Sequence, residues 1–264
     1  MKKLIALLLA YSLAGCAQAD YEADLKGADP GCCLLRDVLP NGPLVLKQGN
    51  GDHREAPTLS WKDGMLEMAL LAPADLPTDA AASVGIFRSG LSFGQGQYFS
   101  VNATFQNPQR DKSKDPWTVL IIARTGDVAD ASNLPRLQIS LQVVNGLAKL
   151  KVMEGPNAGD TNAIILNPTE QTYAIADLQG FPAINDAIYT GPQEFTLKLS
   201  VKPDGTGTAL LTSPAFDPLS IDFKTNIFTI TGGAPLTTFG AALANVSSDL
   251  PASVDVKHFE IWAH

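Results

Sequence analysis

Histidine and cysteine are scarce in this sequence, with three of each among 264 residues. The histidines, His53, His258 and His264, are scattered, and no His-Glu-x-x-His motif is present. The sequence also lacks a Gly-rich phosphate loop followed by Lys-Ser or Lys-Thr. Metalloproteases of that type and P-loop nucleotide-binding enzymes depend on those motifs, so neither class is expected.

Positive charge is in short supply as well. Lysine and arginine total 19 against 27 acidic residues, which gives a net charge of −8, and the basic residues form no stripe. Nucleic-acid-binding domains neutralise phosphates with clustered Lys and Arg, so nucleic acid is not an expected partner. The same deficit argues against docking on anionic lipid through charge alone.

Hydrophobic runs of membrane-spanning length are missing too. Leu4–Leu13 is mostly apolar but too short to cross a bilayer. It follows the basic start Met1-Lys-Lys and ends in the small residues Ala14 and Gly15 before Cys16. A basic region, an apolar region and small residues in that order are typical of a secretory signal peptide, which we assign to residues 1–15.

The end of this segment adds a second interpretation. Leu13-Ala14-Gly15-Cys16 resembles the bacterial lipobox, at which the cysteine is acylated and becomes the first residue of the mature chain. The resemblance implies a lipidated Cys16, a tether over residues 16–43 and a lipid-anchored protein of the cell envelope. Ala17 in place of Asp favours the outer membrane if the cell is Gram-negative. The alternative is an ordinary signal peptide with an unrelated cysteine.

Removal of residues 1–15 would take away two lysines and no acid, so the net charge would move from −8 to about −10. The two remaining cysteines, Cys32 and Cys33, are adjacent. Across a trans peptide their Cα atoms would be about 3.8 Å apart, which is below the usual disulfide range of roughly 4.4–6.8 Å. A strained vicinal disulfide, two reduced thiols and bonds to another chain all remain open, and an oxidising compartment favours the first.

Three central runs are strand-like, Tyr98–Gln106, Trp117–Arg124 and Leu137–Val144, and the first and third alternate between apolar and polar residues. A period of two is typical of strands with one face on a core and one face toward water. Antiparallel sheets carry such strands. We therefore expect a sheet with one broad solvated face rich in amides and hydroxyls.

Further strands are indicated on both sides of this block. Asp63-Gly64 and Asn145-Gly146 are hairpin turn signals, and Lys202–Thr206 separates a third pair of strands. The apolar pattern of Ser253–Trp262 slips by one residue at Lys257-His258, which indicates a β-bulge. The remaining predicted strands are Leu44–Leu46, Val84–Ser89, Thr172–Leu178, Ile221–Lys224, Ile227–Thr231 and Thr237–Ala244.

This pattern predicts an all-β protein: an antiparallel β-sandwich or jelly roll formed as a single domain over residues 44–264. The segments Gly85–Val101 and Phe259-Glu260-Ile261-Trp262 resemble strands of the concanavalin A-like lectin/glucanase superfamily. Laminin G-like domains and family-16 glycoside hydrolases belong to that superfamily. The resemblance implies two large, curved antiparallel sheets.

The resemblance to family-16 hydrolases also implies an expectation about catalysis. Those enzymes carry Glu-x-Asp-x-Glu on one strand, and a retaining mechanism needs two carboxylates about 5 Å apart. The matching positions here are Gln138, Ser140 and Gln142. A glutamine cannot act as nucleophile or transfer a proton as a carboxylate does. The resemblance therefore implies a protein without that hydrolytic chemistry, and we predict no catalytic residues.

The same residues are candidates for binding sugar hydroxyls, because an amide offers a donor and an acceptor together. The candidate ligand-binding residues are Asn102, Trp117, Arg124, Gln138, Ser140 and Gln142. An ordinary hydrophilic sheet face, with Trp117 packed in the core, is the alternative. No cofactor is expected. Asp127, Asp130, Asp160 and Asp204 would suit a structural calcium ion, but no compact Asp-x-Asp cluster exists, and turn positions explain them.

Three functions follow as hypotheses. The first is a lipid-anchored, non-catalytic sandwich that binds a polysaccharide or a glycosylated partner at the cell envelope. The second is a structural or protein-interaction lipoprotein, and the third is a glycoside hydrolase or polysaccharide lyase with an unrecognised site. A fold alone does not decide among them.

Overall fold

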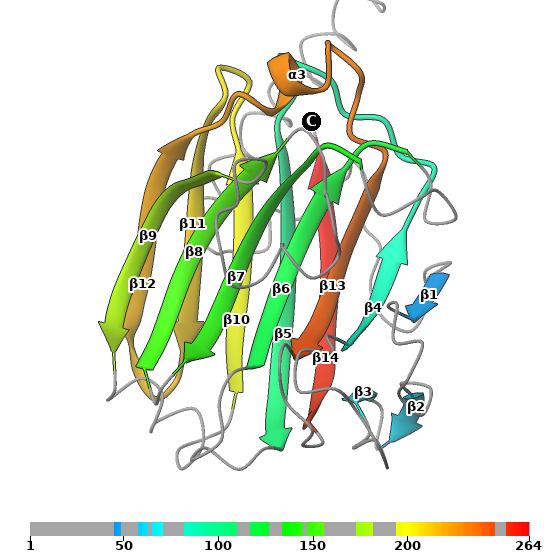
Figure 1. Cartoon of the computed structure of the whole chain (residues 1–264), viewed down its shortest axis with the longest axis vertical. Helices are drawn as coiled ribbons and strands as arrows, with labels where there is room; N and C mark the ends of the chain where they lie inside the picture. Colours follow the sequence, from blue (N-terminus) through cyan, green and yellow to red (C-terminus); the bar gives the residue numbers. More distant parts are fainter. Residues whose placement is uncertain are drawn as a thin grey trace, which may run out of the picture.

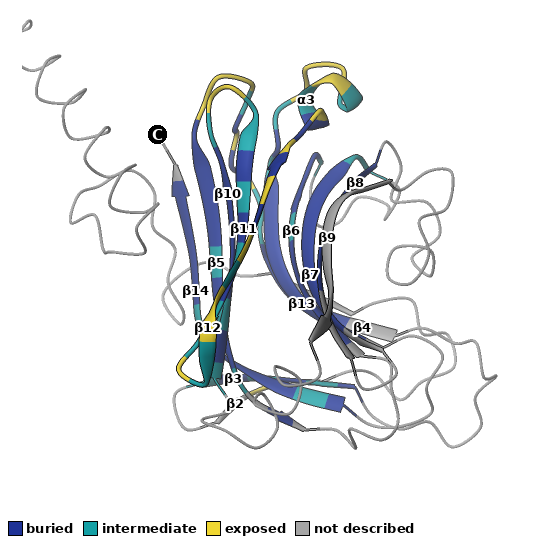
Figure 2. Ribbon diagram, turned by 90° about the vertical axis from the view of Figure 1, so that its left-hand side faces the viewer, coloured by how far each residue is buried: buried dark blue, intermediate teal, exposed yellow. Residues whose placement is uncertain are grey.

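A computed structural model describes residues 45–48, 58–62, 65–70, 82–109, 117–126, 134–144, 147–155, 173–181, 194–245 and 252–263. Within these residues the chain forms two antiparallel sheets of seven strands each. The sheets pack face to face as two layers (Figures 1 and 2). The predicted all-β sandwich is therefore confirmed. Cys16, Cys32, Cys33, Asp127, Asp130 and Asp160 lie outside the described residues.

Sheet A has the strand order β1-β4-β13-β6-β7-β8-β9. Its strands are β1 (Val45–Gln48), β4 (Ala82–Arg88), β13 (Thr238–Asn245), β6 (Trp117–Arg124), β7 (Arg136–Val144), β8 (Leu147–Gly155) and β9 (Tyr173–Phe181). Figure 2 shows this sheet curving away from its partner, so that its outer face is concave.

Sheet B has the order β12-β11-β10-β5-β14-β3-β2. Its strands are β12 (Phe216–Lys224), β11 (Thr206–Ser213), β10 (Glu194–Val201), β5 (Phe99–Gln109), β14 (Ala252–Ala263), β3 (Met65–Leu70) and β2 (Thr58–Lys62). All three predicted hairpins form, as β2–β3, β7–β8 and β10–β11. The register of β14 against β5 shifts between Val256 and His258, which confirms the predicted bulge.

The core lies between the sheets and consists of every second residue of the central strands. Val119 and Ile121 of β6 and Leu137 and Ile139 of β7 are fully buried there. At one end, the rings of Phe93 and Phe239 meet edge to face with centroids 5.1 Å apart. Burial of this apolar area is the main stabilising term of the fold, and it fixes which side chains of sheet A point outward.

The predicted strand at Ile227–Thr231 is wrong, because the structure has a helix, α3 (Ile227–Ile230), at this place. Its β-branched residues favour strands, but the preceding residues are tied to sheet A. The hydroxyl of Thr225 and the N–H of Asn226 both donate to the carboxylate of Glu154, at 2.6 and 2.9 Å. This tertiary anchor directs the chain into one helical turn above β8 and overrides the local preference.

Candidate functional site

The outer face of sheet A presents the side chains that alternate with those of the core, and most of them are polar. We call this the concave face and define it by Thr118, Leu120 and Arg124 of β6, Arg136, Gln138, Ser140 and Gln142 of β7, and Lys151 and Met153 of β8. β7 pairs with β6 on one side and β8 on the other. Gln138, Ser140 and Gln142 therefore form a row along the middle of three adjacent strands.

These side chains are buried, contrary to the expected solvated face. Gln138, Ser140 and Gln142 are only 1%, 4% and 3% exposed. An ordinary hydrophilic surface would leave them open to water. The period-two pattern correctly identified which residues share a face, but periodicity carries no information about how deeply that face is enclosed. A ligand that contacts these groups would thus be held away from bulk water.

Gln138, Thr118 and Arg136 of the concave face carry buried polar atoms with no hydrogen-bond partner in the protein. They are the two amide atoms of Gln138, the hydroxyl of Thr118 and Nη2 of Arg136. Leaving such an atom buried and unsatisfied costs about 1–3 kcal/mol, and native proteins keep few of them. On sheet A these atoms lie on the neighbouring strands β6 and β7, and a second group, from Ser100 and Asn102, lies on β5 of sheet B. The group on sheet A could be satisfied by one polar ligand bound on the concave face.

Two guanidinium groups meet at one end of the concave face. Arg124 and Arg136 stand directly opposite each other in the β6–β7 register, and they are 6% and 7% exposed. Burial, with the nearby charge of Arg124, lowers the pKa of Arg136 to about 9. Arg136 is therefore still cationic at neutral pH, in a place that is unfavourable for a charge.

A third cation lies on β8. Lys151 is 6% exposed and stands opposite Ser140 in the register. No carboxylate belongs to the concave face among the side chains that the structure describes. At its margin, Asp177 of β9 occupies the register position opposite Lys151. Arg124, Arg136 and Lys151 thus give the concave face three basic side chains among those that the structure describes, although the protein as a whole is acidic.

Two of the predicted site residues do not join this group. Asn102 lies on β5 and therefore in sheet B, where its register partners are Lys198 and Glu260. The Glu260 carboxylate accepts hydrogen bonds from Nε2 of His258 at 2.7 Å and Nε1 of Trp262 at 3.2 Å. Trp117 is the first residue of β6, but its side chain is outside the described part of the structure.

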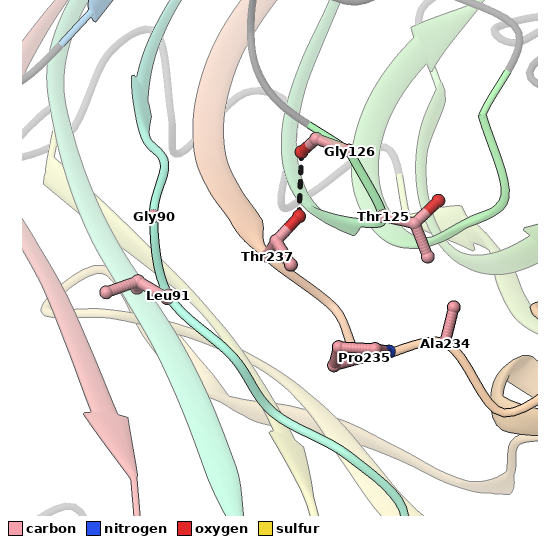
Figure 3. Close-up of a pocket in the computed structure, with 7 residues that line it drawn as sticks. All are labelled: Gly90, Leu91, Thr125, Gly126, Ala234, Pro235 and Thr237. Carbon is pink, nitrogen blue, oxygen red and sulfur yellow. Dashed lines mark hydrogen bonds between the residues drawn. The ribbon is translucent and has the colours of Figure 1, made fainter.

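A small pocket lies where β6, β13 and the β4–β5 connection end together (Figure 3). Its volume is about 370 Å³, and its lining residues are Gly90, Leu91, Thr125, Gly126, Ala234, Pro235 and Thr237. The Thr237 hydroxyl donates to the carbonyl of Gly126 at 2.8 Å, and the Thr237 N–H donates to the carbonyl of Arg124. Because Arg124 directly precedes Thr125, this pocket adjoins the cationic end of the concave face.

The same connection contains a motif with catalytic associations. Gly90-Leu91-Ser92-Phe93-Gly94 matches the Gly-x-Ser-x-Gly pattern of the hydrolase nucleophile elbow, in which the serine occupies a sharp strand-to-helix turn. Here the segment joins two strands, and Phe93 forms an isolated bridge with Leu236. Ser92 is exposed in this connection. The match is therefore one of sequence and not of structure.

Metal binding finds no support in the described residues, where no three His, Cys, Asp or Glu side chains lie close enough to hold an ion. Asp204 is a turn residue: its carboxylate accepts hydrogen bonds from the N–H and hydroxyl of Thr206 at 2.9 and 2.6 Å. In the same residues, no helix has the length and apolarity needed to cross a membrane.

Sequence reasoning missed Arg136, Lys151 and Thr118. Extending the predicted strand Leu137–Val144 back by one residue would have placed Arg136 in the same row as Gln138. The Asn145-Gly146 turn would then have put Lys151 beside that row. The pairing of β6 with β7 was not predicted, so the opposed arginines had no sequence signal.

Comparison with known proteins identifies the fold but no sequence family. No protein-family model matches the chain, and no curated protein matches it in sequence. A lectin from Bauhinia forficata in complex with GalNAc has 10% identity, a TM-score of 0.53 and coverage of 87% of this chain and 98% of its own. The legume lectin-like domain of Entamoeba histolytica has 10% identity, a TM-score of 0.51 and coverage of 88% and 97%.

A third similar structure is the exoplasmic/lumenal domain of VIP36 in a Ca²⁺/Man₃GlcNAc-bound form. It has 11% identity, a TM-score of 0.52 and coverage of 83% of each chain. At these identities the likeness concerns the fold alone. This chain has the concanavalin A-like β-sandwich fold of the legume lectins.

Proposed function

We propose that the protein is a non-catalytic carbohydrate-binding module that is anchored by lipid at Cys16 in the cell envelope, in the outer membrane if the cell is Gram-negative. Its ligand is a polysaccharide or a glycosylated partner, and its binding site is the concave face of sheet A. The fold is shared with lectins that were solved with sugars. Fold alone does not give function, so the proposal depends on the site.

The proposal rests on the buried and unsatisfied side-chain amide of Gln138. It lies in the middle of the concave face, is 1% exposed, and neither its Oε1 nor its Nε2 has a hydrogen-bond partner in the protein. A sugar hydroxyl donates and accepts at once, so adjacent hydroxyls of one ring satisfy both atoms of a primary amide. Thr118 supplies a further unsatisfied hydroxyl on the neighbouring strand.

Catalysis by paired carboxylates is not part of the proposal. The positions that correspond to the family-16 catalytic strand hold Gln138, Ser140 and Gln142, which lack the acidity and nucleophilicity that glycoside hydrolysis requires. We therefore expect the protein to bind glycan chains without shortening them. Release of reducing ends or of unsaturated sugars from a bound polysaccharide would instead favour the hydrolase or lyase alternative.

The test is affinity electrophoresis of the full-length protein, in mild detergent, through gels that contain mannan, galactomannan, xylan, β-glucan or polygalacturonate. We expect one or more of these polymers to retard the protein, and the double substitution Gln138→Leu, Gln142→Leu to abolish the retardation. Asn102→Ala is the matched control, because it removes an amide from the other sheet. Retardation by none of the polymers would favour a structural or protein-interaction lipoprotein.

The anchor has its own test. Cys16→Ser removes the thiol that the lipobox resemblance makes the acylation site. We expect the wild-type protein to incorporate labelled fatty acid and to partition into the membrane fraction, and the variant to do neither. Equal membrane association of both proteins would refute the lipid anchor without affecting the proposed glycan site.

A further inference from the structure

Arg136 is the most unfavourably placed charge on the concave face. It is 7% exposed, its Nη2 has no hydrogen-bond partner in the protein, and it faces the like charge of Arg124 across the β6–β7 pair. Like charges at directly opposed positions of neighbouring strands are destabilising. Taking a charge out of water is costly unless an opposite charge and hydrogen bonds compensate for it.

The cost is removed if an anion binds. The planar guanidinium group donates two parallel hydrogen bonds to a carboxylate or a sulfate, and such charge-assisted pairs are stronger than neutral hydrogen bonds. Arg136 and Gln138 are two positions apart on β7, so their side chains project from the same face. An anionic group at Arg136 would therefore lie beside the unsatisfied amide of Gln138.

We propose that the concave face selects acidic polysaccharides, with Arg136 binding the carboxylate of a uronic acid or the sulfate ester of a sulfated sugar while Gln138 and Thr118 bind hydroxyls of the same chain. The inference rests on the proposed glycan binding and adds the class of glycan. Lys151 on β8 stands opposite Ser140, which lies in the same row of β7 as Arg136 and Gln138.

Because the protein is acidic overall, binding of an acidic polysaccharide is expected at the concave face and not over the general surface. With a net charge of −8, the molecule as a whole repels a polyanion. Acidic glycans would therefore be captured only where buried cations are concentrated, because burial limits the screening of a charge by salt. Binding should weaken with added salt but persist at physiological ionic strength.

The experiment compares polymers that differ only in charge, with the full-length protein in mild detergent. Polygalacturonate is paired with its methyl-esterified form for the carboxylate, and dextran sulfate is paired with dextran for the sulfate. We expect at least one charged polymer to bind about tenfold or more tightly than its neutral counterpart, the difference that a charge-assisted hydrogen-bonded pair carries. The pair that shows the preference identifies the anion.

Arg136→Met is the decisive variant, since it keeps a long side chain and removes the charge. It should abolish the preference for the charged polymer, so that the charged and neutral polymers bind with similar affinity. Lys224→Met, at an exposed position of sheet B, is the matched charge control and should leave the preference intact. Arg136→Lys keeps the charge without the planar fork and should retain part of the preference, which provides a second test if the Met variant does not fold.

The outcomes separate this inference from the function on which it rests. If charged and neutral polymers bind equally well, or if Arg136→Met weakens both alike, the acidic-glycan assignment is wrong and glycan binding stands. If no polymer of either kind binds, both proposals fail. Loss of the charged preference in Lys224→Met as well as Arg136→Met would show that only net charge matters, and would also overturn the assignment.

Discussion

The carboxylate of Glu154, on β8 of sheet A, accepts a 2.6 Å hydrogen bond from the hydroxyl of Thr225, which follows β12 of sheet B. Both side chains are buried, at 4% and 6% exposure. The same carboxylate oxygen accepts the N–H of Asn226. One acidic group thus ties the two layers together at the end where α3 begins.

We expect Glu154→Ala to lower the free energy of unfolding by about 2–4 kcal/mol, because it leaves the Thr225 hydroxyl buried without an acceptor. Glu154→Gln keeps one acceptor oxygen and should cost about half as much. Urea denaturation measures both values. In a double-mutant cycle with Thr225→Val, a coupling of about 1 kcal/mol or more would confirm the pair, and purely additive losses would contradict it.

Gly240 on β13 lies where sheet A has no room for a side chain. A Cβ at this position would be 2.7 Å from the carbonyl oxygen of Ile86 and would overlap the ring of Phe87. We expect Gly240→Ala to cost about 2–3 kcal/mol of stability, the usual penalty for overpacking. The control is Gly94→Ala, whose new Cβ would meet nothing closer than 3.9 Å. Thermal unfolding that ranks the two variants equally would refute this account.

Gln138 links stability to binding. Replacing it with Leu removes a buried, unsatisfied amide and supplies an apolar side chain of similar size. The free energy of unfolding should therefore rise by about 1–2 kcal/mol, while retardation by glycan decreases. Urea denaturation and affinity electrophoresis on the same preparation measure the two effects. A Leu variant that is less stable than the wild type would mean that the amide has a structural partner.

Asp204 makes part of the stability dependent on pH. Hydrogen bonds from the hydroxyl and the N–H of Thr206 lower the pKa of its carboxyl below 3.8. The unfolded chain then binds this proton at a higher pH than the folded protein does. The stabilisation is therefore complete above pH about 4 and is lost as the pH falls through the folded pKa.

The corresponding variant is Asp204→Asn, which does not titrate. Urea midpoints of the wild type and this variant should differ at pH 7 and converge toward pH 2. A difference that stays constant over this range would contradict the assigned origin of the shift. Asp222→Asn, another exposed carboxylate of sheet B with a single threonine hydroxyl bond, serves as the comparison.

The sequence predicted most of the strands, the three hairpins and the bulge in β14, because alternation and turn residues are local signals. It placed Gln138 and Gln142 on one face for the same reason. It could not predict that Asn102 belongs to the other sheet, since the pairing of β5 with β14 joins residues far apart in the chain. Burial of the concave face was missed because periodicity carries no information about depth, and the opposition of Arg124 and Arg136 was missed because the register of β6 against β7 had no sequence signal.

The last two strands, β13 and β14, each lie in the interior of a sheet. β13 separates β4 from β6, and β14 separates β3 from β5. A ribosome-bound chain that has not yet released residues 238–263 therefore has two half-sheets with open edges, which are sites of aggregation. Completion of both sheets must therefore wait until residues 238–263 have been synthesised. During this delay the unpaired strand edges would leave the incomplete domain prone to aggregation.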